Sequence, residues 1–159
     1  MAILAAGVLA IINPVAQFGK ARDAKRKSDL SQIEKALETF YQDNGKYPDT
    51  VSFKIMSTKG DNSAADWGTN QWAPYMSTLP KDPSGSRNYV YYSPTDTFTG
   101  RQGQSYYLYA SLEGGANDSQ ACNKGNACVS LTANNLSGTV CGTGVPVCNY
   151  GISSPNVSP

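Results

Sequence analysis

The first twelve residues, MAILAAGVLAII, contain no charged side chain, and this stretch limits what the chain can fold into more than any other. Asn13-Pro14 interrupts the apolar run, which otherwise continues to Phe18. Eighteen helical residues are about 27 Å long, slightly less than the roughly 30 Å hydrocarbon core of a bilayer. Such side chains need a bilayer, the chain's own core or other chains to remove them from water.

Three interpretations of this apolar segment compete. A secretory signal peptide has basic residues before its apolar run and small residues at a cleavage site, whereas here the basic residues follow the run. A buried core helix rarely starts at the first residue and continues directly into a basic stretch. In the third interpretation, residues are missing upstream and the segment is the end of a longer, membrane-length helix.

Gly7, Asn13 and Pro14 weaken helical structure within this segment. A proline inside a helix removes a backbone hydrogen bond and disfavours helical geometry at the preceding residue, and glycine adds backbone freedom. A kink or a helix boundary is the simpler explanation. The functional alternative is a segment that is helical in lipid and can extend when it packs elsewhere.

Helix-forming residues predominate from Ala16 to about Asn44, and the DNGKYP sequence ends this predicted helix because Gly45 suits a C-cap and Pro48 blocks continuation. Apolar side chains recur at helical spacing in its second half and predict a face buried in a globular head. Polar side chains fall largely on the other side. The predicted head-core residues are Leu30, Ile33, Leu37 and Phe40, and the predicted outward residues are Asp29, Glu34, Lys35 and Glu38.

Five basic residues between positions 20 and 27 are typical of a solvated helix face. Two alternatives remain open, namely acidic groups on a neighbouring subunit and lipid phosphates just outside the apolar segment. A nucleic-acid role is weakly supported because no aromatic residues are interleaved, and we expect no stable nucleic-acid partner. The five residues are Lys20, Arg22, Lys25, Arg26 and Lys27.

The middle of the chain predicts a small antiparallel sheet after a long connection at residues 49–79. Residues 89–92 and 105–113 are rich in tyrosine, and the second run alternates as a hairpin strand does. ACVSLTA, at residues 127–133, is a plausible third strand. Together with the helix, these strands predict an α+β fold in which the sheet, at about 88–133, packs on the amphipathic half of the helix.

All four cysteines lie near the C-terminus, in a segment rich in Gly, Asn, Ser and Thr. Their spacing matches neither zinc sites nor redox motifs, so they predict two disulfides and an oxidising compartment. Three pairings are possible, and we expect the two local ones because short loops close most easily. The expected bridges are Cys122–Cys128 and Cys141–Cys148, within a tail that is otherwise irregular and frays at Pro159.

Several classes of enzyme are disfavoured. The chain has no histidine, which is the commonest general base and metal ligand. Carboxylates are scattered, and there is no nucleophile–base pair and no phosphate-binding glycine motif. The net charge of +1 gives no field that attracts nucleic acid or acidic substrates. We therefore expect a protein without catalytic activity and without a cofactor.

Two stretches resemble the type IV pilins and the pseudopilins of type II secretion. ILAAGVLAIINPVAQFGKARDAKRKSDLSQIEKALETFYQDNGKYP is similar to the N-terminal helix of that family, and LPKDPSGSRNYVYYSP with YYLYASLE is similar to its loop and sheet. The resemblance implies the pilin fold, with a protruding half-helix at residues 1–27, a globular head at 28–133 and a disulfide-stapled tail at 134–159. From Gly114 onward the chain resembles no recognised part of the family, as expected of its variable region.

The start of the chain departs from the family pattern. Members carry a leader that a prepilin peptidase removes, and they begin the mature chain with a methylated residue followed shortly by a Glu. Met1 aligns inside the apolar helix instead, so we expect about a dozen further residues upstream.

The resemblance also implies a function as the major pilin of an extracellular type IV pilus, for adhesion, motility or DNA uptake. The subunit would lie in the inner membrane before assembly, interact with pilus assembly machinery, and then join identical subunits in a helical filament. Gly7, Asn13 and Pro14 would mark the segment that loses helicity in the filament. The implied assembly-core residues are Ile3, Leu4, Val8, Leu9, Ile11, Ile12, Val15 and Phe18.

Two alternatives remain. A secretion pseudopilin would have a calcium-binding loop after the sheet, for which Glu113 and Asp118 are weak candidates, because calcium requires several oxygen ligands. A membrane-anchored surface module for glycan or DNA would use the loop with Trp67 and Trp72 as its platform.

Overall fold

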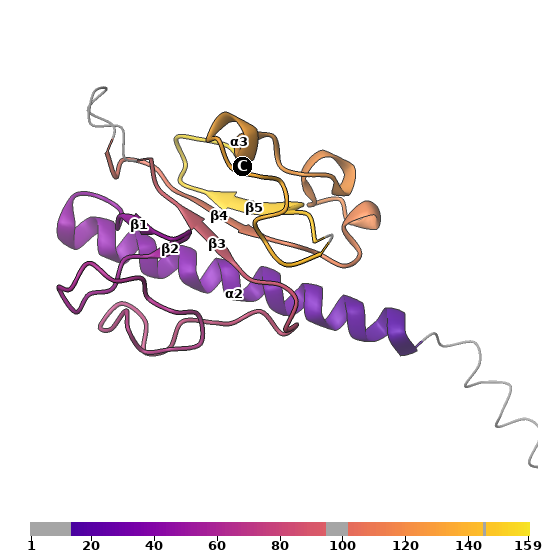
Figure 1. Ribbon diagram of the computed structural model, residues 1–159, viewed down its shortest axis with the longest axis horizontal. Coiled ribbons are helices and arrows are strands. Elements are labelled where there is room, and N and C mark those ends of the chain that lie inside the picture. Colours follow the sequence, from indigo (N-terminus) through magenta and orange to yellow (C-terminus); the bar gives the residue numbers. More distant parts are fainter. Residues whose placement is uncertain (1–13, 95–101, 145) are drawn as a thin grey trace, which may run out of the picture.

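The computed structural model describes residues 14–94, 102–144 and 146–159 (Figure 1). The long helix α2 is followed by two short hairpin strands, a three-stranded sheet, two 3-10 turns and a short helix. The order is α2 (Pro14–Asn44), β1 (Thr50–Val51), β2 (Lys54–Ile55), β3 (Val90–Tyr92), β4 (Tyr107–Ala110), η1 (Gly115–Asn117), η2 (Cys122–Gly125), α3 (Val129–Ala133) and β5 (Tyr150–Ser153).

Helix α2 is continuous over 31 residues, or about 46 Å, which confirms the predicted long helix. Pro14 is its first residue, where a missing N–H costs nothing. Gly45 ends the helix with a positive φ of 70°, and its N–H donates to the Tyr41 carbonyl at 2.8 Å. Of the predicted head-core residues, three have no exposed surface and Phe40 is partly buried; the three are Leu30, Ile33 and Leu37.

The main sheet has the order β3-β4-β5 and is antiparallel throughout. The predicted hairpin is present, with Val90 opposite Tyr109. The prediction of a third strand at residues 127–133 was wrong, because this stretch contains helix α3, where Leu131 is buried three residues after Cys128. The third strand is β5, within the segment we expected to be irregular, and it pairs with β4 over four residues.

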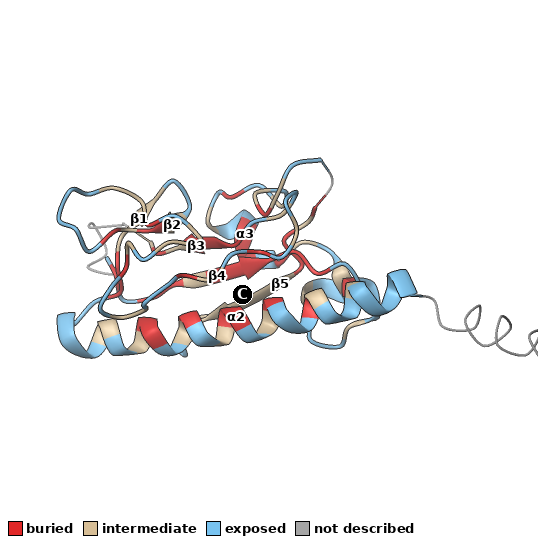
Figure 2. Cartoon of the chain, turned by 90° about the horizontal axis from the view of Figure 1, so that it is seen from below, coloured by how far each residue is buried: buried red, intermediate tan, exposed pale blue. Residues whose placement is uncertain are grey.

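The two faces of the sheet pack against different layers. Side chains of one face, including Tyr91 and Leu108, join the α2 core, whereas Val90 and Tyr109 join a second cluster with α3 and the tail. Figure 2 shows the buried residues of α2 on the side that faces the sheet. The molecule therefore has three layers, which are the helix, the sheet and a disulfide-bonded outer layer, and the predicted α+β pilin fold is confirmed.

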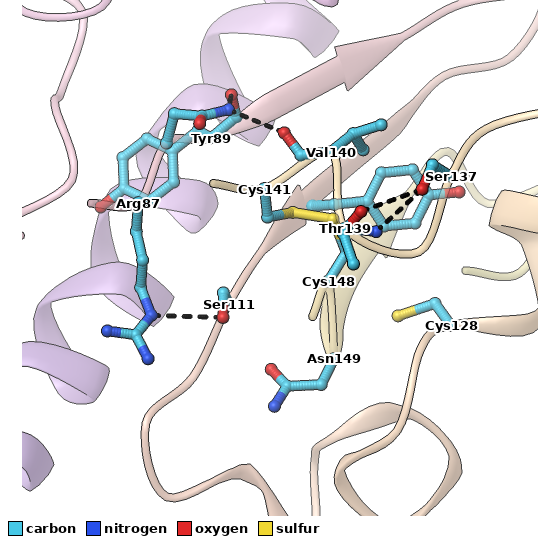
Figure 3. Close-up of a disulfide and its surroundings, with 12 residues drawn as sticks. Arg87, Tyr89, Ser111, Cys128, Ser137, Thr139, Val140, Cys141, Cys148 and Asn149 are labelled. Atoms are coloured by element: carbon cyan, nitrogen blue, oxygen red, sulfur yellow. Dashed lines mark hydrogen bonds between the residues drawn. A yellow bond between two sulfur atoms is a disulfide. The ribbon is translucent and has the colours of Figure 1, made fainter. Parts of the chain in front are cut away.

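Both expected disulfides are formed in the outer layer, and none of the four cysteines is free. Figure 3 shows the bridge between Cys141 and Cys148. Both of these residues are fully buried. The Asn88 N–H donates to the Cys141 carbonyl at 2.8 Å, and the Cys128 N–H donates to the Cys148 carbonyl at 3.0 Å. These hydrogen bonds connect the two tail cysteines to the chain just before β3 and to the start of α3.

The long connection at residues 49–79 covers the C-terminal half of α2. Trp72 has no exposed surface and packs on Phe40, with ring centroids 6.1 Å apart. Trp67 is half-buried against Tyr89 at 5.8 Å. Trp72 therefore belongs to the core and cannot contribute to the predicted binding platform for glycan or DNA, whereas Trp67 keeps part of its surface exposed.

Candidate assembly site

The N-terminal end of α2 exposes apolar side chains to solvent. Val15 is 74% exposed and Phe18 is 64% exposed, and they are two of the four large apolar residues that the structure describes as exposed. Figure 2 shows this end of the helix projecting beyond the head. Among the helices of the described residues, none combines the length and hydrophobicity needed to cross a membrane.

Most of the predicted assembly core lies outside the described residues. Residues 3–12 belong to that part of the chain, as do Gly7 and Asn13 of the predicted helix-melting segment. Val15, Phe18 and Pro14 are described, and all three are exposed on the first turns of α2.

Arg26 is the centre of a charged network that joins α2 to the head. Its side chain is fully buried and binds Asp82 with two hydrogen bonds, at 2.8 Å from Nε and 2.9 Å from Nη2. Its Nη1 donates to Asp23 at 2.7 Å and to Glu113 at 2.9 Å. Desolvation disfavours a buried guanidinium, and these three carboxylates offset that cost.

The carboxylates Glu113 and Asp23 extend the network to the end of β4. Arg22 binds Glu113 with two hydrogen bonds, of 2.7 Å and 2.5 Å, and Arg87 lies 3.7 Å from Glu113. The Asp23 carboxylate accepts the backbone N–H groups of Glu113 and Gly114 at 2.9 Å and 2.8 Å. Three cations therefore balance three anions where the helix leaves the head.

We predicted that the basic cluster forms a solvated helix face, and this holds only in part. Most of its charges are paired with carboxylates of the same chain, although Lys20 and Lys25 remain exposed. Lys27 binds Asp118 at 2.5 Å and Lys25 binds Asp29 at 3.0 Å. Among the described ion pairs, Lys20 alone of the five basic residues takes no part. Sequence reasoning missed this arrangement because the partners of Arg22, Arg26 and Lys27 include residues 56 to 91 positions away.

Asp29 also departs from the prediction, which placed it on the outward side of the helix. It is only 3% exposed, and it accepts a hydrogen bond from the Tyr89 hydroxyl at 2.8 Å. Glu34, Lys35 and Glu38 are half-buried or exposed. Asp29 follows Arg26 by three residues, so both side chains lie on the same face of the helix. This spacing was the available signal that the face contacts the head.

The two weak calcium candidates are both bound by basic side chains. Glu113 contacts Arg22 and Arg26, and Asp118 contacts Lys27. Within residues 14–94, 102–144 and 146–159, no group of three or more Asp, Glu, Cys or His side chains could hold a metal ion.

The hydrogen bond from Arg22, followed by that from Arg26, lowers the pKa of Glu113 to about 2. A depressed pKa stabilises the fold above the unfolded value of 4.5, and this contribution is lost as pH falls toward 2. We therefore expect Glu113→Gln to lower the urea midpoint at pH 6 and to have progressively less effect below pH 4.5.

Glu34→Gln is the control of opposite sign, since burial raises the pKa of Glu34 and its charged form is disfavoured in the fold. Glu34→Gln should leave stability at pH 6 unchanged or higher. Equal effects of Glu113→Gln at pH 6 and pH 2.5 would contradict the pH prediction.

A groove of about 640 Å³ lies beside this network, between α2 and the segment that follows β4. Val15, Gly19 and Lys20 line one wall, and Gly114 and Asn117 line the other. The groove opens next to the exposed apolar end of α2. The exposed apolar helix end and the groove beside it make this part of the surface the candidate site for binding another polypeptide.

Comparison with protein families identifies the chain. A family model described as "Type II secretion system (T2SS), protein G" matches residues 13–125, which is more than two thirds of the chain. No curated protein and no solved structure matched it in the same comparisons. The matched range includes α2, strands β1 to β4 and every residue of the charged network, whereas Cys141, Cys148 and β5 follow it. The chain therefore belongs to the protein G family of type II secretion systems, and through it to the pilins and pseudopilins that its helix resembles.

Proposed function

We propose that this chain is a structural subunit that polymerises with identical copies into a helical filament, without catalytic activity. The observation that carries the proposal is the exposed apolar end of α2, at Val15 and Phe18. Removing each of these side chains from water contributes about 1.5–3 kcal/mol of favourable free energy. A polymer of identical chains supplies that burial, and family membership supports the same conclusion.

Before assembly, the apolar N-terminal residues would hold the subunit in the inner membrane. Lipid tails and neighbouring apolar helices offer similar surroundings, so moving from bilayer to filament costs little hydrophobic free energy. Leader removal by a prepilin peptidase and extrusion by assembly machinery complete the proposed pathway.

Two kinds of filament fit this subunit. The family match favours a pseudopilus of a type II secretion system. A different observation favours an extracellular type IV pilus, for adhesion, motility or DNA uptake. The outer layer, with both disulfides, lies mostly beyond the matched residues and would form a cross-linked surface suited to exposure outside the cell. Deleting the gene separates them, because loss of a pilus removes surface filaments whereas loss of a pseudopilus leaves secreted proteins inside the cell.

Assembly can be tested with a matched pair of substitutions. Val15 is 74% exposed on α2 and Val129 is 72% exposed on α3, so the head should accept an aspartate at either position. We expect Val15→Asp to reduce filament yield at least about tenfold, since a buried unpaired charge costs well over 1.4 kcal/mol.

Val129→Asp should assemble like the unmodified chain. Filaments are counted by negative-stain electron microscopy of sheared material, and antibody labelling identifies the chain. Absence of filaments from the unmodified chain, or equal yields from the two variants, would refute the proposal.

A further inference from the structure

We propose that the groove between α2 and the Glu113–Asp118 segment is the docking site for the apolar residues 3–12 of a second copy of this chain. The inference rests on the proposed filament and adds a specific contact to it. The groove measures about 640 Å³, within the range of sites that enclose a sizeable ligand.

The two walls of the groove lie near each other at Gly19 and Gly114. A Cβ atom at Gly19 would lie 3.6 Å from Glu113 Oε2, and one at Gly114 would lie 3.4 Å from Asp23 Oδ2. Val15 on the helix and Asn117 on η1 also line the groove. The ion pairs of Arg22 and Arg26 with Glu113 join the two walls.

Charge indicates an uncharged occupant. Three carboxylates line the groove, and each is already bound by a cation of its own chain, Asp23 by Arg26, Glu113 by Arg22 and Asp118 by Lys27. An apolar segment can therefore cover them without leaving an unpaired charge buried. The ammonium of Lys20 can stay in water while its methylene groups cover the occupant. A basic partner would find no free carboxylate among these three.

Residues 3–12 are the segment of this chain that fits, since they are apolar and uncharged over ten positions. Val15 and Gly19 on the groove wall belong to the same helix that follows this segment in sequence. A contact between two different surfaces of one chain is heterologous, and its repetition produces an open helical polymer. The same contact thus buries the segment and propagates the filament.

The four native cysteines are all in disulfides, so introduced cysteines are the only reactive thiols. We would prepare Leu9→Cys and Asn117→Cys as separate variants, mix them during assembly and oxidise the filaments. We expect a covalent dimer in the mixture and none from Leu9→Cys mixed with Lys59→Cys, because Lys59 is exposed and does not line the groove.

A bulky side chain provides an independent test. Asn117→Trp should fill the groove and lower filament yield at least about tenfold, whereas Ser119→Trp, exposed two residues away and outside the groove, should not. Unchanged thermal unfolding of both variants would show that the head is intact.

The outcomes distinguish failure of the docking site from failure of the filament. Normal filaments in which Asn117→Cys forms no dimer, and reacts with a maleimide as fast as in detergent-solubilised subunits, would overturn the docking site alone. An intramolecular cross-link in unassembled Leu9→Cys/Asn117→Cys protein would assign the groove to the chain's own segment and would also overturn it. If the unmodified chain forms no filaments, the proposed function itself fails.

Discussion

Replacing Arg26 with methionine should destabilise the head by about 3–5 kcal/mol, the usual cost of removing one partner from a buried ion pair. The guanidinium has no exposed surface and donates to three carboxylates. Without it, Asp82 retains the Ser84 N–H at 2.8 Å but no cation, although its side chain is fully buried. The measurement is urea unfolding in mild detergent, followed by the fluorescence of Trp67 and Trp72.

Lys35→Met is the matched control for this prediction. Lys35 lies on the same helix, is exposed and takes part in no described ion pair, so its loss should change stability by less than about 0.5 kcal/mol. Adding Asp82→Asn to Arg26→Met should recover part of the loss, because it removes the unpaired buried charge. Similar midpoints for Arg26→Met and Lys35→Met would show that the network does not stabilise the fold.

Local patterns were sufficient to predict much of this fold. The stripe of Leu30, Ile33 and Leu37 predicted the buried face of α2, and Gly45 with Pro48 predicted its end. The tyrosine-rich runs predicted the β3–β4 hairpin. The short sequence separations of the cysteines, 6 and 7 residues, indicated the correct pairing. Each of these features depends on residues close together in the sequence.

The features that were missed depend on contacts between distant residues. ACVSLTA has the composition of a strand, but its burial has helical spacing because Cys128 and Leu131 face the same cluster. Strand β5 was missed because its pairing with β4 joins residues some 40 positions apart, and no local pattern encodes that choice. The close approach of Gly151 to the Tyr109 ring, where a Cβ would lie 3.0 Å from Cδ1, became visible only in three dimensions.

The candidate site was likewise predicted in part, for the features that depend on nearby residues. The apolar segment and the exposed Val15 and Phe18 follow from composition, so the assembly surface was expected at this end of the helix. The charged network was not expected, since a basic run on a helix is usually solvated. Through this network Arg22 and Arg26 join α2 to residues of the head at the point where the helix leaves it.

Removing the Cys141–Cys148 bridge by the double substitution Cys141→Ala/Cys148→Ala should destabilise the chain by about 2–4 kcal/mol. Closing a loop of this length accounts for roughly 2 kcal/mol through the entropy of the unfolded chain. The rest comes from the cavity left where both side chains were fully buried. The carbonyls of the two residues accept hydrogen bonds from Asn88 and Cys128, so loosening them also weakens the start of β3 and helix α3.

Cys122→Ala/Cys128→Ala is the matched comparison, because it opens a loop of nearly the same length but Cys122 is only half-buried. Its unfolding free energy should fall by less than that of the first variant, since the chain-entropy contributions are similar and the cavity is smaller. Thermal unfolding with and without dithiothreitol measures both effects. Dithiothreitol should lower the stability of each variant less than that of the unmodified chain, because one of the two bridges is already absent. A larger loss from the Cys122–Cys128 variant would mean that burial does not control the contribution of these bridges, and that the outer layer depends chiefly on the link between η2 and α3.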